Sequence, residues 1–137
     1  MSDDPIRRYL RERGSAAHVV AGGVEGLVLR WEETAAAVSA GYALTLDDYL
    51  NDLDGRQILE DVMRSMPPAD GGLARRIGRA DALMRAATVP AGRCVWGDDE
   101  RPGRDPVRSW WYFVVPGRPG EDLVADLRVA GLPVGAG

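Results

Sequence analysis

The sequence contains no lysine, and all 17 of its basic residues are arginine. Cysteine and histidine occur once each, as Cys94 and His18. One cysteine excludes an intramolecular disulfide, and the wide separation of Cys94 from His18 does not match the close spacing of zinc ligands. No apolar run approaches the roughly 20 residues that a transmembrane helix requires, and the charged N-terminus lacks the apolar core of a signal peptide. We therefore expect a cytoplasmic protein that neither enters a membrane nor binds zinc.

The length of 137 residues fits one compact domain. Hydrophobic residues make up 45% of the chain and charged residues 28%, as in an ordinary globular domain. The net charge of −4 at pH 7 opposes non-specific attraction to a phosphate backbone. The sequence thus predicts a single domain over residues 1–137 that does not bind nucleic acid.

Apolar residues recur at helical spacing in six segments. The clearest places Val28, Trp31 and Val38 on one face and has Gly41 after its end. The predicted helices cover residues 4–13, 24–40, 46–53, 55–65, 73–87 and 119–130. Two further segments, rich in β-branched and aromatic residues, are typical of strands. They are residues 93–96 and 109–115, joined by a charged loop over residues 98–108 that we expect to be mobile. With a frayed tail at residues 131–137, the predicted fold is a mainly helical α+β domain. Five or six helices would pack with one two-stranded antiparallel sheet.

Residues 45–61 carry a dense group of carboxylates and a single cation. Thr45 with Asp48, and Asp54 with Gln57, have the spacing of helix capping boxes. These two boxes predict that two helices meet at Asp54. The carboxylates left without such a structural role are Asp47, Asp52, Glu60 and Asp61.

The acidic segment does not match a calcium-binding loop. When Gly55 is aligned to the sixth position of an EF-hand loop, Asp52 and Asp54 fall correctly at the third and fifth. The first position is then Leu50, which supplies no ligand, and the twelfth is Asp61 rather than glutamate. We therefore expect no calcium site.

The sequence contains no GxSxG, Walker, GxGxxG or HExxH motif. Cys94 and His18 could form a thiolate–imidazolium pair, but Cys94 lies in an apolar segment, as a buried structural cysteine does. We assign no catalytic residue, no metal and no cofactor. An enzyme that uses the carboxylates of residues 47–61 stays open as an alternative. It would act with or without a divalent ion held by Asp48 and Asp52, which lie four apart on one helix face.

An acidic helical surface with nearby aromatic residues favours capture of a basic protein, because charge speeds association and aromatic side chains anchor contacts. The strand prediction puts Trp110 and Trp111 on opposite faces, so large rings would be exposed unless another element covers them. An oligomer built on residues 110–113, such as a homodimer, is therefore a third alternative. The predicted partner-binding residues are Asp47, Asp48, Asp52, Glu60, Asp61, Tyr49, Trp110 and Trp111.

A broader pattern adds weight to a binding role. It consists of Trp31, Gly41-Tyr42, residues 48–53 and Trp110-Trp111-Tyr112. In this pattern the chain resembles small uncharacterised bacterial accessory proteins, some of which are immunity partners of polymorphic toxins. The resemblance covers about two-thirds of the chain in pattern only and contains no catalytic motif. It implies a non-enzymatic protein that binds another protein.

Overall fold

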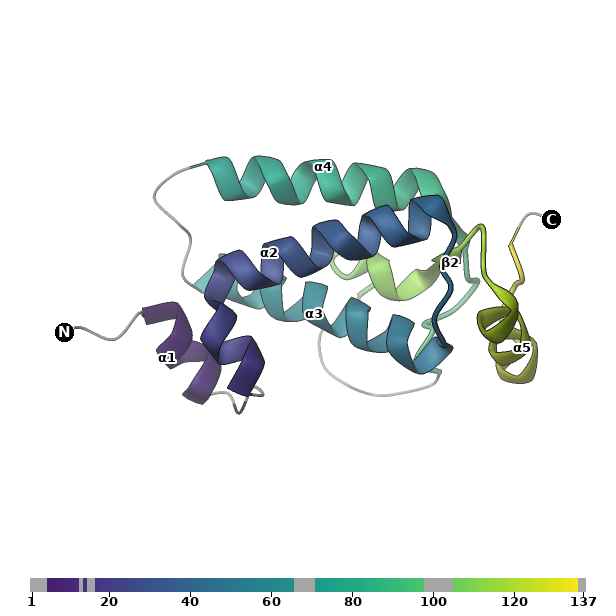
Figure 1. Ribbon diagram of the computed structural model, residues 1–137, viewed down its shortest axis with the longest axis horizontal. Helices are drawn as coiled ribbons and strands as arrows, with labels where there is room; N and C mark the ends of the chain where they lie inside the picture. The colour runs from purple at the N-terminus through teal and green to yellow at the C-terminus, as the bar shows by residue number, and fades with distance from the viewer. Residues whose placement is uncertain (1–4, 13, 15–16, 66–70, 98–104, 136–137) are drawn as a thin grey trace.

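A computed structural model describes residues 5–12, 14, 17–65, 71–97 and 105–135 (Figure 1). Up to residue 22, side chains are described only for residues 8, 10–12 and 14. The elements are α1 (Pro5–Glu12), α2 (Ala17–Ala40), α3 (Leu46–Ser65), α4 (Gly72–Ala87), β1 (Thr88–Pro90), the 3-10 helix η1 (Trp110–Phe113), β2 (Val114–Pro116) and α5 (Glu121–Ala130). The prediction of a mainly helical α+β fold with one two-stranded antiparallel sheet is confirmed.

Helix α2 is the centre of the fold. It packs along α4 and also contacts α3 and α1, and α5 lies at the end of the molecule where α2 finishes (Figure 1). The helical spacing seen in the sequence is confirmed, because Val28, Trp31 and Val38 are all buried. Gly23 interrupts the regular helix with φ 60° and ψ −158°, and Gly41 ends it with φ 128°. Both backbone conformations favour glycine. Among the described residues, no helix has the length and apolarity needed to cross a bilayer.

Helix α3 corrects the prediction of two helices meeting at Asp54. It runs without a break from Leu46 to Ser65, and Gln57 does not cap a helix but accepts a hydrogen bond from Ser109. Gly55 lies inside the helix with the Arg30 side chain across it, because a Cβ built there would be 3.6 Å from Arg30 Nε. The packing of α2 on α3 therefore outweighs the low helix propensity of glycine.

The sheet has the predicted antiparallel pairing but uses other residues. Strand β1 pairs with β2 through Val89 opposite Val115, whereas residues 93–96 form a turn region. Pro90 and Pro116 leave both strands without an N–H donor at these positions, which limits pairing with further strands.

The segment Trp110–Phe113 is a 3-10 helix rather than a strand. Trp111 and Tyr112 are buried, whereas Trp110 and Phe113 are half-buried. The predicted alternation of faces is therefore wrong. In a 3-10 helix, residues three apart share a side, so Trp110 lies on the same side as Phe113.

The tail expected to fray is partly packed. Leu132 is only 5% exposed, and its N–H donates to the carbonyl of Leu127. Gly135 lies against Gly117 so closely that a Cβ on it would be 2.6 Å from the Gly117 carbonyl oxygen. Residues 136 and 137, and residues 98–104 of the predicted loop, lie outside the described residues.

Candidate functional site

Exposed carboxylates gather where α3 and α5 begin. The start of α3 lies against α5, because the Leu46 N–H donates to Asp126 Oδ2 in the middle of α5 at 3.0 Å. The segments that precede the two helices also meet, since the Gly120 N–H donates to the Tyr42 carbonyl at 2.7 Å. The acidic end, as we call this surface, comprises the exposed residues Asp47, Asp48, Glu121 and Asp122. Carboxylates at helix N-termini are stabilised by the helix dipole. The sequence analysis missed Glu121 and Asp122, since nothing local indicates that α5 begins beside α3.

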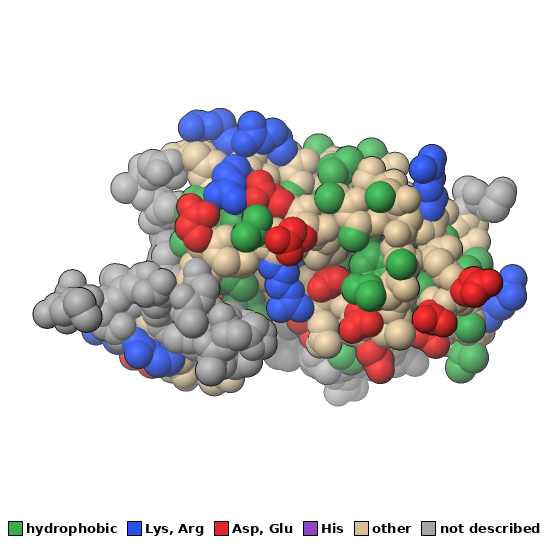
Figure 2. Space-filling view, in the orientation of Figure 1, with side chains coloured by type: hydrophobic (Ala, Val, Ile, Leu, Met, Phe, Trp, Pro, Cys, Tyr) green, Lys and Arg blue, Asp and Glu red, His purple; other side chains and the backbone are tan. Residues whose placement is uncertain are grey.

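The acidic end lies away from the main group of cations. In Figure 2, red side chains gather over the lower right of the face, where α3 begins and α5 lies. Arginine side chains lie along the start of α4 at the upper left, where Arg75 and Arg79 are exposed. Beside the acidic end, Leu44 is 53% exposed. The surface therefore joins negative charge to one large apolar side chain.

The predicted Thr45 capping box is confirmed. The Asp48 N–H donates to Thr45 Oγ1 at 3.2 Å, and the Thr45 N–H donates to Asp48 Oδ2 at 3.2 Å. Asp48 therefore has a structural role although its side chain is exposed. Asp47 has none, since it makes no hydrogen bond or ion pair within the part of the chain that the structure describes.

Asp52, predicted as a free carboxylate, is paired. Its Oδ2 accepts a 2.6 Å hydrogen bond from the Tyr42 hydroxyl, and its Oδ1 lies 3.5 Å from Arg30 Nη2. Burial and this hydrogen bond raise the pKa of Tyr42 far above its ordinary value. Tyr49 is fully buried and donates its hydroxyl to the Val114 carbonyl at 2.7 Å. Tyr49 is therefore a core residue and not part of an exposed partner surface.

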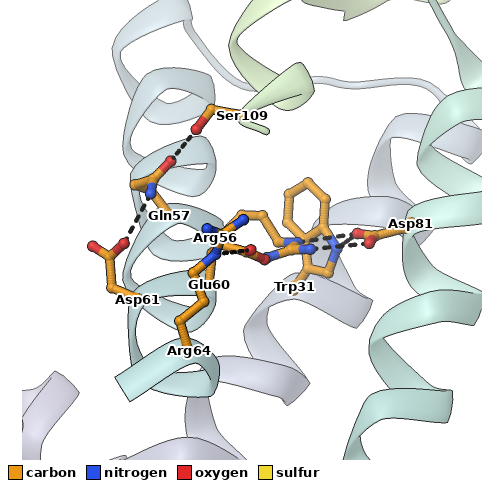
Figure 3. A network of polar contacts seen from close by, with 8 residues as sticks. All are labelled: Trp31, Arg56, Gln57, Glu60, Asp61, Arg64, Asp81 and Ser109. Atoms are coloured by element: carbon orange, nitrogen blue, oxygen red, sulfur yellow. Dashed lines mark hydrogen bonds and ion pairs between the residues drawn. The ribbon is translucent and has the colours of Figure 1, made fainter. Parts of the chain in front are cut away.

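A charged cluster lies inside the fold around Arg56 (Figure 3). Although Arg56 is only 5% exposed, its Nε and Nη2 donate to the two carboxylate oxygens of Asp81 at 3.1 and 3.0 Å. Asp81 Oδ1 also accepts a 2.8 Å hydrogen bond from Trp31 Nε1. The Arg56 guanidinium lies 4.3 Å from the ring centroid of Trp111, a cation–π distance. This cluster ties α3 to α2, α4 and η1.

Glu60 completes the charged cluster and is not a free acid. Its two oxygens accept from Arg56 Nη1 at 3.1 Å and from Arg64 Nε at 2.6 Å. Burial raises the pKa of Glu60, but the hydrogen bonds from Arg64 and Arg56 outweigh it and hold the pKa below the ordinary value. Glu60 is thus ionised at neutral pH and forms two ion pairs within the protein.

A polar cavity of about 400 Å³ lies beside this cluster, between α3 and the segment before η1. On its wall the buried Ser109 hydroxyl donates to Gln57 Oε1 at 2.8 Å, and Gln57 Nε2 donates to Asp61 Oδ1 at 3.0 Å (Figure 3). Gln57 is an amide and not a general base, so its contact with Ser109 does not activate the serine as a nucleophile. Asp61, like Glu60, is held within the protein.

The aromatic segment is mostly internal. Trp111 is 1% exposed, and its Nε1 is the one buried side-chain polar atom without a hydrogen-bond partner among the described residues. Trp110 is half-buried, with the Arg85 guanidinium 4.0 Å from its ring centroid. Tyr112 donates its hydroxyl to Asp54 Oδ1 at 2.7 Å. Of the two predicted tryptophans, only Trp110 reaches the surface.

Two chemistries that the sequence analysis weighed are a metal site and a Cys94–His18 pair. No three His, Cys, Asp or Glu side chains come together as a metal site in the described part of the chain, and Leu50 at the failed calcium position is buried. Cys94 is half-buried, whereas the side chain of His18 lies outside the described residues. The Cys94–His18 pair therefore stays a hypothesis.

Comparisons with protein-family models, with curated proteins and with solved structures find no match to this chain.

Proposed function

We propose that this chain is a non-enzymatic binding protein whose acidic end captures a basic protein. In its concrete form the partner is a basic toxin, and binding neutralises it. The supporting observation is the meeting of two acidic helix starts, which exposes Asp47, Asp48, Glu121 and Asp122 on one surface. Clustered charge of one sign attracts an oppositely charged partner over a distance and raises the association rate.

Two features suit this surface to a protein partner. Leu44 is 53% exposed next to the carboxylates and supplies apolar surface that a protein partner can bury. Asp47 has no partner within the described part of the chain, so contact with a cation would not break an existing pair. The binding surface differs from the one expected from sequence, because Asp52, Glu60, Asp61, Tyr49 and Trp111 are engaged inside the fold.

The test is to recover a partner with the immobilised protein and to measure its association rate at several salt concentrations. The variant Asp47→Asn/Asp122→Asn should slow association about tenfold at low salt and flatten the salt dependence. The matched control is Glu12→Gln/Glu33→Gln, which removes the same charge from exposed positions elsewhere. Equal slowing by both variants would indicate a net-charge effect only, and unchanged kinetics in the first variant would contradict the proposal.

A further inference from the structure

A groove of about 380 Å³ lies at the opposite ends of α2 and α4 from α1, where both helices finish. Its apolar lining includes Val38, Leu83, Ala86 and Val89, and Leu83 is 39% exposed. A water molecule takes up about 30 Å³ in the liquid, so a space of this size corresponds to roughly a dozen water molecules. Its volume falls within the range of small-molecule sites, and its lining combines apolar and polar surface.

Two polar residues on this groove have no partner in the described structure. Ser39, near the end of α2, and Arg118, after β2, both line the groove. Neither side chain makes a hydrogen bond or ion pair with another described residue. A hydroxyl and a guanidinium beside an apolar wall match a ligand with an apolar body and one anionic end, because a guanidinium binds a carboxylate with two parallel hydrogen bonds.

Some of the carbonyl groups at the ends of α2 and α4 are hydrogen-bonded within the protein. The carbonyl of Met84 accepts from Thr88 Oγ1 at 2.9 Å, and that of Ala87 accepts from the Gly117 N–H at 3.0 Å. The carbonyl of Ala37 accepts from the Gly41 N–H at 2.9 Å. These bonds use one carbonyl in the last turn of α2 and two in the last turn of α4.

From these observations we infer that the groove binds a small apolar monocarboxylate. The hydrocarbon chain lies against Leu83, Ala86 and Val89, and the carboxylate pairs with Arg118 and accepts from the Ser39 hydroxyl. The site is separate from the acidic end and does not depend on capture of a basic protein.

The probe is octanoate, titrated into the ¹⁵N-labelled full chain below its micelle concentration and followed by amide chemical shifts. We expect saturable shifts at Ser39, Leu83 and Val89, and weaker binding of 1-octanol, which has the same chain without the charge. Arg118→Gln should weaken octanoate binding about tenfold and leave octanol binding unchanged, because a hydrogen bond to a charged group is lost. Arg128→Gln, at another exposed arginine outside the groove, should bind octanoate as the wild type does.

A steric variant tests the location. Ala86 is exposed and lines the groove, whereas Ala82, one turn earlier on α4, is exposed and does not. Ala86→Trp should abolish binding of both probes, and Ala82→Trp should leave it intact. The inference is overturned if octanoate gives no saturable shifts in the groove, or if Ala86→Trp binds normally. Equal binding of octanoate and octanol, with no effect of Arg118→Gln, would also overturn it.

Discussion

Arg56 of α3 and Asp81 of α4 form a bidentate ion pair inside the protein, with both donor–acceptor distances near 3 Å: 3.1 Å from Nε and 3.0 Å from Nη2. The Arg56 side chain is 6% exposed and that of Asp81 is 20% exposed. The pair lies between Trp31 and Trp111, whose rings flank the guanidinium. Removing Asp81 leaves the Arg56 charge with little access to water, so the fold should be sensitive to this substitution.

Asp81→Ala should lower the free energy of unfolding by about 3–5 kcal/mol, because the buried Arg56 loses its bidentate partner and keeps only Glu60, and Trp31 Nε1 loses its acceptor. The double variant Arg56→Met/Asp81→Leu should lose less, since the buried guanidinium is removed together with Asp81 and Glu60 keeps its pair with Arg64. Urea unfolding of the three proteins measures both effects. Arg64→Ala is the control: its ion pair with Glu60 is more exposed and should contribute less than about 1 kcal/mol. A double variant less stable than Asp81→Ala would contradict this account.

Gly55 and Gly135 should respond to alanine in opposite directions. A Cβ at Gly55 would make an ordinary 3.6 Å contact with Arg30, so Gly55→Ala should stabilise the protein by about 0.5–1 kcal/mol through higher helix propensity. A Cβ at Gly135 would be 2.6 Å from a backbone oxygen, and φ there is +53°. Gly135→Ala should therefore destabilise. Thermal unfolding of the two variants tests the prediction, and a shift in the same direction for both would contradict it.

Stability should fall in acid partly through Glu60. Its pKa in the folded protein is lowered from the ordinary value of 4.5, so the unfolded state binds a proton more readily than the folded state does. The stabilisation is present above pH 4.5 and is lost as the pH falls through the lowered folded pKa. Glu60→Gln should be less stable at pH 7 and should show a shallower loss between pH 5 and pH 3, as measured by urea unfolding at each pH. An unchanged pH profile would show that Glu60 is not ionised in its pairs.

Raising the pH should also destabilise the protein, through Tyr42 and Tyr49. The pKa values of both hydroxyls are raised, chiefly by burial, so stabilisation is present below the ordinary tyrosine pKa of 10.0 and is lost as the pH rises above it. In a spectrophotometric titration, Tyr42 and Tyr49 should resist ionisation near pH 11 until the protein unfolds. Tyr42→Phe should reduce the resistant number by one. Ionisation of all tyrosines near pH 10 in the folded state would contradict the arrangement around Asp52.

The predictions that hold concern contacts between near neighbours in the sequence. The Thr45–Asp48 capping box spans three residues, and Gly41 ends α2 through its own backbone conformation. The buried face of α2 follows from helical periodicity alone. The predictions that fail depended on contacts with distant residues. Gly55 lies within a helix because Arg30 crosses it, and nothing in residues 54–57 indicates that neighbour.

In the acidic segment, residues 45–61, the features that depend on distant residues were again the ones that the sequence did not predict. Sequence identifies its carboxylates but not which ones are engaged, because Asp52 is bonded to Tyr42 and Asp54 to Tyr112, 58 residues away. The partnership of Arg56 with Asp81 also spans 25 residues.

By itself, the sequence determined the fold class, the extent of α4, the C-terminal end of α2 and the helix cap at Thr45, because short-range periodicity and backbone preferences specify them. Only the tertiary structure decided which charges are buried, which aromatic rings are covered, and that α3 and α5 begin side by side. These outcomes depend on packing between segments that are far apart in the chain. The physical reason is that a carboxylate has the same local sequence signature whether it faces solvent or an arginine from another helix.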